Sequence, residues 1–172
     1  METARLVLQR PRLGDAEAIF RTYSSDPDVT RFLSWPVHVS IEQTRAFLQW
    51  SDAEWRRWPA GPYLIFLRAH FALVGGTGIG FETPDRASTG YVLAKAAWGQ
   101  GYATEALTAV VDIARQVGVQ ALGAICHVDH RASAHVLEKC GFACEGTLRR
   151  FIVFPNVSAI DPCDVLKYSR RL

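Results

Sequence analysis

The first part of the chain shows an alternating pattern of apolar and polar positions and then a helical one. Residues 5–10 (RLVLQR) alternate, which predicts a first strand. Asp15 precedes a segment whose apolar residues fall on one helical face (AEAIFRTY), so Asp15 is expected to be its N-cap. After a turn at DPDV, Ser40 and Gln43 have the capping-box spacing that begins a second helix.

From residue 63 onward the pattern becomes that of strands. Residues 63–69 and 72–82 predict a hairpin, and residues 88–95 predict a third strand after the turn TPDR. The second of these strands contains four glycines, which indicates a bulged or crowded strand rather than a phosphate-binding loop.

The rest of the chain predicts two helices and three strands. A helical face begins at Ala103 and ends near Gly118, and residues 121–128 predict a buried strand. A short helix then ends at Gly141, and two strands follow near residues 148–154 and 164–169. This order predicts an α/β fold with a mixed sheet and helices on both faces, in a single domain over residues 1–172.

The composition is that of a globular protein. Of the 172 residues, 49% are hydrophobic and 21% are charged, and the formal net charge of +2 is too close to neutral to favour a nucleic-acid partner. No apolar run is long enough to span a membrane, and the first residues lack the apolar core of a signal peptide. We therefore expect no membrane partner and a cytoplasmic location.

The four cysteines form no C-x-x-C pair, which argues against a structural zinc site. We expect reduced thiols and no metal. Three histidines lie close to Cys140 and Cys144 in the sequence: His127, His130 and His135. A metal site that uses them is therefore the alternative.

The stretch WGQGYATEAL (residues 98–107) suggests an anion-binding site. Gly99 and Gly101 lie directly before the helix that begins near Ala103, where backbone N–H groups converge and the helix dipole favours an anion. Glycine lets a phosphate come close to the main chain. The stretch matches neither the Walker pattern nor G-x-G-x-x-G, so a glycine-rich corner without a ligand is the alternative.

Three segments in order, TGYVLAKAAWGQGYATEAL, HRASAHVLEKCGF and EGTLRRF…CDVLKYS, resemble the GCN5-related N-acetyltransferase (GNAT) superfamily and its RimJ/RimL-type enzymes. The opening ARLVLQRPRLGDAEAIF is also similar, so the resemblance spans nearly the whole chain. It implies a splayed, mainly antiparallel central sheet flanked by helices. It also implies acetyl-CoA as donor, a primary amine of a protein N-terminus or small molecule as acceptor, direct attack in a ternary complex, and a monomer or homodimer.

The resemblance assigns coenzyme contacts to two segments. The pyrophosphate corresponds to the loop and helix start at Trp98, Gly99, Gln100, Gly101, Tyr102, Ala103 and Thr104. The pantetheine arm corresponds to the third strand of the hairpin region at Tyr91, Val92 and Leu93, where backbone groups would pair with its amides. A backbone N–H near Leu93 would polarise the thioester carbonyl.

Several positions depart from the family pattern. Trp98 replaces a frequent Arg or Gln, as in many RimJ/RimL-type sequences, and Ser88 replaces a frequent glutamate. His130 stands where an asparagine usually contacts coenzyme or substrate, and Leu137 where many members have a proton-donating tyrosine. RimJ/RimL-type proteins carry a serine at the position of Ser133, so the resemblance assigns the thiolate proton to Ser133. A local bond within the first helical turn is the alternative role.

No sequence motif singles out one residue as the general base. Glu82, His127 and Asp129 are candidates because each lies near a strand end where the acceptor should enter, and Glu145 matches a family glutamate. An α-amine with a pKa of roughly 8 is about one-tenth neutral at pH 7, whereas lysine at about 10.4 is neutral to less than about 0.1%. A protein without a strong base therefore suits α-amines or similarly acidic amines.

Three functions stay open on the sequence. The first is an N-acetyltransferase for a protein N-terminus or small amine. The second is an antibiotic-modifying acetyltransferase for an aminoglycoside, which would favour an acidic acceptor cleft. The third is a non-catalytic module that binds coenzyme A, which the missing asparagine and glutamate allow. Turnover of acetyl-CoA with a set of amines separates the third from the first two.

Overall fold

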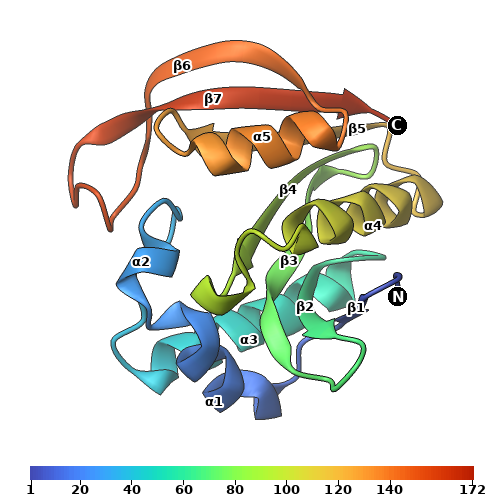
Figure 1. Cartoon of the computed structure of the whole chain (residues 1–172). Helices are drawn as coiled ribbons and strands as arrows, with labels where there is room; N and C mark the ends of the chain where they lie inside the picture. The colour runs from blue at the N-terminus through green and yellow to red at the C-terminus, as the bar shows by residue number, and fades with distance from the viewer.

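The computed structural model describes residues 1–172 and contains a seven-stranded sheet in the order β1-β2-β3-β4-β5-β7-β6 (Figure 1). The strands are β1 (Leu6–Gln9), β2 (Pro62–Leu67), β3 (Leu73–Thr83), β4 (Arg86–Leu93), β5 (Ala121–His127), β6 (Ala143–Val153) and β7 (Pro162–Arg171). The helices are α1 (Ala16–Ile19), α2 (Pro27–Thr30), α3 (Ile41–Arg57), α4 (Tyr102–Gln116) and α5 (Arg131–Lys139), none of which is long and apolar enough to cross a membrane. Only β4 and β5 pair in parallel, so the expected mixed fold with a mainly antiparallel sheet is confirmed.

Helices cover both faces of the sheet, and each face has its own apolar cluster. The neighbouring residues Leu64 and Ile65 of β2 belong to different clusters, because successive side chains of a strand point to opposite faces. Ile65 packs in a cluster with Leu107 of α4 and Leu137 of α5. Leu64 packs in a cluster with residues of α1 and α3, such as Leu48. The helices α4 and α5 therefore lie over one face, and α1 and α3 lie over the other.

Both helices of the α4–α5 face end at a glycine with positive φ. Gly118 has a φ of 86° and Gly141 a φ of 74°. After α4, the N–H of Val119 donates to the Ala114 carbonyl at 3.0 Å, one of the paired bonds of a Schellman motif. The expected ends of these helices are confirmed.

Two predictions in the N-terminal part were wrong. Asp15 makes no side-chain capping bond to α1; a 3₁₀ turn precedes this helix, and the Asp15 carboxylate accepts from the N–H of Arg12 at 2.7 Å. The DPDV segment is not a simple turn but contains the helix α2. Its N-cap is Asp26, which accepts from the N–H of Asp28, and Pro27 occupies the first helical position. Asp and Pro favour both turns and helix starts, so the pattern alone could not separate them.

The C-terminal hairpin is longer than expected. β6 begins at Ala143 rather than near residue 148, and β7 continues to Arg171. β6 is an edge strand whose pairing with β7 shifts register twice. Because bulges interrupt the two-residue alternation, the first half of β6 carried no clear strand pattern.

β4 and β5 separate soon after they start to pair. Their pairing is confined to Arg86–Ser88 and Ala121–Gly123, so the rest of β4 has no strand on its β5 side. On its other side β4 packs tightly against β3, where a Cβ added to Gly75 would lie 2.1 Å from the Val92 carbonyl oxygen. The expected splay is confirmed, and the glycine-rich strand is a crowded one rather than a phosphate loop.

Candidate active site

The loop between β4 and α4 presents a set of backbone donors. Gly99 and Gly101 have φ values of 73° and 78°, in the region that glycine adopts without strain. The amides from Gly99 to Thr104 donate no hydrogen bond within the chain, and the first helical bond runs from the N–H of Glu105 to the Gly101 carbonyl. These amides lie at the positive end of the α4 dipole, which makes the corner suited to an anion.

Arg5 in the N-terminal segment lies beside this loop. Its Nη1 donates to the Gln100 carbonyl at 2.9 Å, and its guanidinium lies 4.7 Å from the centre of the Tyr102 ring. Glu105 holds the arginine, accepting from its Nε at 2.7 Å and from its backbone N–H at 2.8 Å. Burial opposes ionisation of Glu105, but hydrogen bonds from Thr3 and Arg5 lower its pKa overall. No sequence signal marked Arg5, because its partner lies 100 residues away.

The end of β4 adjoins the same corner. The Nε1 of Trp98 donates to the Leu93 carbonyl at 2.8 Å and fixes the loop to the strand. Beyond Ser88 the β5-facing edge of β4 is unpaired, so its N–H and C=O groups can pair with an extended amide-containing chain. Tyr91 packs on the α4–α5 face of the sheet, whereas Val92 packs on the α1–α3 face.

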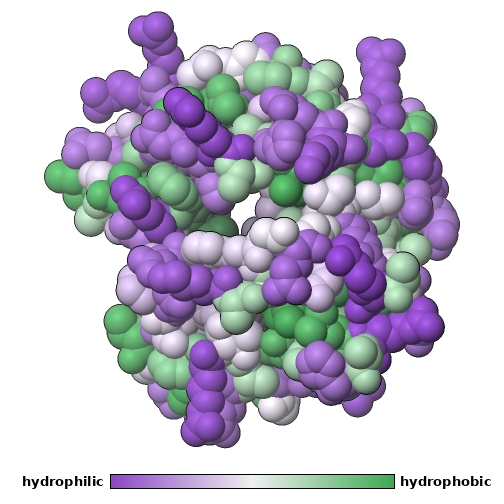
Figure 2. Space-filling view, viewed as in Figure 1, coloured by the Kyte–Doolittle hydropathy of each residue, from purple (hydrophilic) through white to green (hydrophobic).

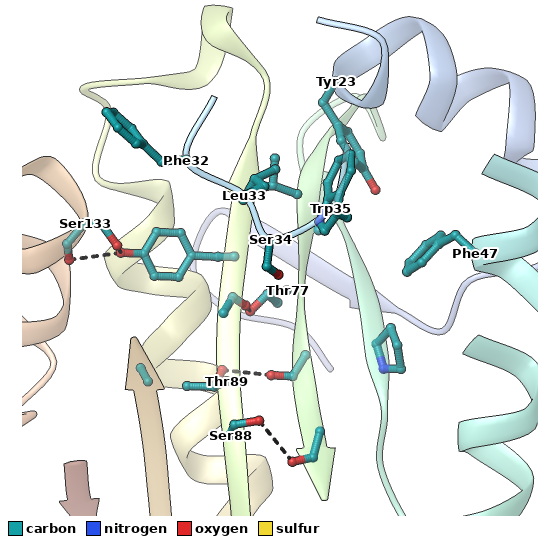
Figure 3. Close-up of a pocket in the computed structure, with 18 of the residues that line it drawn as sticks. Tyr23, Phe32, Leu33, Ser34, Trp35, Phe47, Thr77, Ser88, Thr89 and Ser133 are labelled. Carbon is teal, nitrogen blue, oxygen red and sulfur yellow. Dashed lines mark hydrogen bonds between the residues drawn. The ribbon is translucent and has the colours of Figure 1, made fainter. Parts of the chain in front are cut away.

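Ser133 of α5 (labelled in Figure 3) meets Tyr91 of β4 at the splay. Their hydroxyl oxygens are 3.0 Å apart, and the Tyr91 hydroxyl is 3.1 Å from the Ser133 carbonyl oxygen, to which it can also donate. Burial raises the pKa of Tyr91 to about 12, so its phenol is protonated at neutral pH. Cys126 of β5 lines the same space, and burial raises the pKa of its thiol to about 11. The hydroxyl pair can therefore donate a proton, while Cys126 is a poor nucleophile.

A cavity of about 730 Å³ extends from α1 and α3 through the splay to Ser133. Figure 2 shows the surface hollowed between the two halves of the molecule, and Figure 3 shows aromatic side chains around the hollow. Many lining side chains are aromatic: Tyr23, Phe32, Trp35, Phe47, Trp50 and Tyr63. No Asp, Glu, Lys or Arg lines the cavity.

Two of the histidines near the site pack on Phe32. The Phe32 ring centre lies 4.8 Å from that of His127 and 5.0 Å from that of His130. His130 lines the cavity, and burial, followed by the charge of His127, lowers its pKa. His127 does not line the cavity; it is buried, and its Nδ1 accepts from the N–H of Asp129 at 3.1 Å. Of these two histidines, only His130 therefore lines the cavity together with Ser133.

The other candidate bases lie outside the cavity. Glu82 and Asp129 are exposed and do not line it. Glu145 of β6 pairs instead with the Nζ of Lys167 at 2.7 Å. No group of His, Cys, Asp and Glu side chains is placed to hold a metal ion. The structure thus brings Ser133, Tyr91 and His130 together but leaves Glu82 and His127 out of the cavity lining.

Asn156 holds one wall of the cavity in place. Its Oδ1 accepts from the N–H of Val37 at 2.8 Å, and its Nδ2 donates to the carbonyls of Thr30 at 2.7 Å and Trp35 at 2.9 Å. These bonds tie the loop after β6 to the segment that carries Phe32 and Trp35. The partners lie 119 to 126 residues apart, so no local pattern could have indicated this role.

Comparisons with known proteins agree with this geometry. The family model of the acetyltransferase (GNAT) domain matches residues 5–143. The uncharacterized N-acetyltransferase YoaA of Bacillus subtilis (strain 168) is 33% identical over 155 residues, which cover 88% of this chain and 87% of that protein.

Two solved structures share the fold. A GNAT-family acetyltransferase from Bacillus anthracis has a TM-score of 0.84 at 24% identity and covers 99% of this chain and 97% of its own. RimL, a ribosomal L7/L12 α-N-protein acetyltransferase in complex with coenzyme A, has the same TM-score and identity, covering 99% and 96%. With the family model matching most of the chain, the protein belongs to the GNAT family of acetyltransferases.

Proposed function

We propose that the protein transfers the acetyl group of acetyl-CoA to a primary amine by direct attack in a ternary complex. One observation carries the proposal: the open edge of β4 runs from the Ser133–Tyr91 pair, which lines the passage through the sheet, toward the unpaired amides of Gly99–Thr104 in the loop after the strand. Membership of the GNAT family supports acetyl-CoA as the donor, and coenzyme A is present in the RimL complex.

In this proposal the coenzyme occupies the α4–α5 face. Its diphosphate accepts hydrogen bonds from the amides of Gly99–Thr104, and Arg5 adds a positive charge beside them. The pantetheine amides pair with β4 beyond Ser88, as an added strand would. The thioester then lies in the splay, close to Ser133.

The amine enters through the cavity on the opposite face. Its neutral nitrogen attacks the thioester carbon, and a backbone N–H near Leu93 stabilises the oxyanion. As the C–S bond breaks, Ser133 Oγ passes a proton to the thiolate and is reprotonated by Tyr91 or water. The nitrogen loses one proton, to His130 or to water, so the proton count balances.

The cavity favours an α-amine or another amine of low pKa. No carboxylate lines it to remove a proton from a lysine-like ammonium, and His130 is a weak base. The same absence of carboxylates argues against an aminoglycoside, which carries several positive charges that an acidic cleft would have to balance.

Turnover tests the proposal directly. The purified protein is mixed with acetyl-CoA and a set of α-amines, and released thiol and acetylated amine are both measured. We expect the two products to form in equal amounts. Coenzyme binding by calorimetry without acetylation of any amine would instead identify a module that binds coenzyme A without catalysis.

A further inference from the structure

We propose that the acceptor is a small primary amine that carries an aromatic ring and no second charge. This inference deepens the proposed function and rests on it. It depends on the part of the cavity between Ser133 and the helices α1 and α3, which is continuous with the reacting centre.

The first argument is that the cavity lining has no formally charged side chain at neutral pH. With no Asp, Glu, Lys or Arg in its lining, a second ammonium or a carboxylate on the acceptor would lose water and gain no partner of opposite charge. The two histidines of the lining, His38 and His130, do not supply a cation at neutral pH, because burial lowers the pKa of each. A neutral amine on an uncharged skeleton avoids both costs.

The polar groups of the cavity floor fit a neutral amine. The hydroxyls of Thr77 and Thr89 already donate to the carbonyls of Gly90 and Gly78, at 2.9 Å and 2.8 Å. Their remaining lone pairs can accept from an amine N–H, but they provide no formal negative charge. The floor therefore recognises N–H groups without favouring the ammonium form.

The walls favour an aromatic skeleton. Trp35 and Phe47 face the hollow from two different elements, with Tyr23 above them in the view of Figure 3. A ring between such side chains gains edge-to-face or offset-stacked contacts beyond the burial of its apolar area. Aromatic faces can also attract a cation, but without a carboxylate that attraction is smaller than the cost of removing an ammonium from water.

The volume and the fixed wall favour a small molecule. The cavity of about 730 Å³ also includes the space in the splay beside Ser133, where the thioester lies in the proposed function. The bonds of Asn156 hold the segment of Phe32 and Trp35 as a preformed wall rather than a loose flap. Such preformed and mainly apolar cavities are typical of small-molecule sites.

Amides of amino acids test the inference, because they present the same α-amine with different side chains. We compare kcat/KM for the amides of phenylalanine, alanine and lysine at a fixed concentration of acetyl-CoA. We expect phenylalanine amide to exceed both others by at least about tenfold, because its ring is buried and it adds no charge. If lysine amide or alanine amide equals it, the inference is wrong while the proposed function stands.

A matched pair of charge variants sharpens the test. Ser34 lies in the lining and is exposed, so Ser34→Asp adds a carboxylate to the cavity, whereas Gln49→Asp adds one on an exposed position of α3 outside it. We expect Ser34→Asp to reduce the preference for phenylalanine amide over lysine amide by about twofold to fivefold, because water partly screens an ion pair at an exposed position. We expect Gln49→Asp to leave the preference unchanged. An unchanged preference in Ser34→Asp would contradict the inference.

Two further outcomes are decisive. A serine-initiated peptide acetylated more than about tenfold better than phenylalanine amide would replace the small molecule with a protein N-terminus. If no amine is acetylated, the proposed function fails and the inference about the acceptor fails with it. If amines are acetylated, calorimetry on the coenzyme A complex gives a second test: tighter binding of phenylalanine amide than of lysine amide would support the inference, and equal binding would overturn it.

Discussion

At the proposed reacting centre, the Ser133 hydroxyl bonds to Tyr91 of a neighbouring strand rather than to the backbone of its own helix. This contact differs from the local bond expected of a serine that only begins a helix. Burial keeps Tyr91 protonated, so the two hydroxyls form a short path along which a proton can move. The nearby Cys126 stays a thiol, which favours direct transfer over an acetyl-cysteine intermediate.

We expect Ser133→Ala to lower kcat by roughly 10-fold to 100-fold with little change in coenzyme affinity. General acids contribute about 10²–10⁴-fold, but a thiolate with a pKa near 8.5 leaves fairly well without help, so the effect falls at or below the low end of that range. Steady-state kinetics and calorimetry measure the two quantities. Ser25→Ala, which removes a hydroxyl that donates to the Phe20 carbonyl outside the cavity lining, is the control. A kcat for Ser133→Ala within about twofold of the wild type would show that the thiolate takes its proton from water.

We expect Gly101→Val to weaken coenzyme A binding at least about tenfold, because a branched side chain is strained at φ 78° and would stand beside the anion. Gly118→Val is a matched control at the other end of α4, with a φ of 86° and no atom within 4 Å of the added Cβ. It carries similar strain but lies far from the loop. Calorimetry on the folded variants decides: equal affinities in the two would rule out the loop as the diphosphate site.

Among the elements, the segment between α2 and α3 depends on a partner far along the chain. Asn156 makes two hydrogen bonds to it, at the Val37 N–H and the Trp35 carbonyl, and a third to the carbonyl of Thr30 at the end of α2. The segment has little regular secondary structure of its own, so these bonds and the packing of Phe32 on two histidines set its position. Asn156 is therefore a positioning residue for the acceptor cavity and does not itself line it.

We expect Asn156→Ala to raise the KM for the amine about fivefold to tenfold and to leave the KM for acetyl-CoA unchanged, since each lost hydrogen bond contributes about 1 kcal/mol to the order of the segment. Asn156→Asp keeps the acceptor for the Val37 N–H but turns a carboxylate oxygen toward the carbonyls of Thr30 and Trp35, so its effect should be at least as large. Initial rates with each substrate varied in turn give both constants. Equal increases in the two KM values would point to general loss of structure instead.

The distance along the chain between interacting residues explains which features could be predicted from the sequence. The start of α4 after Gly101 and the ends of α4 and α5 at glycines follow from local residue preferences, so the pattern located them. The splay and the role of Ser133 came from resemblance to a family, and the structure confirms only the splay. Arg5 and Asn156 act through partners about 100 residues away or more, and local periodicity carries no trace of such contacts.

At the scale of the whole molecule, the two faces of the sheet carry different ligands in this account. In the proposed function the diphosphate binds on the α4–α5 face, and the acceptor binds in the aromatic cavity that extends from the α1–α3 face into the splay. The splay of β4 and β5 joins them, which lets a donor and an acceptor meet without either displacing the other. Because burial beside this passage lowers the pKa of His38 and His130, we also expect the stability of the fold to depend on pH.

We expect the free energy of unfolding to decrease as the pH falls below about 6.5. Burial lowers the pKa of both histidines in the folded protein, so the unfolded chain binds more protons in this range and protonation favours unfolding. Urea unfolding at about pH 7.5 and about pH 5.5 measures the change. The double variant His38→Gln/His130→Gln should lose less stability between the two values. An identical loss in the variant would assign the pH dependence to other groups.

Initial rates over a matrix of acetyl-CoA and amine concentrations test the central claim most directly, because that claim places donor and acceptor on opposite faces at the same time. Direct transfer in a ternary complex predicts double-reciprocal lines that intersect. Parallel lines, together with an acetylated protein isolated in the absence of amine, would show a covalent intermediate and contradict the account.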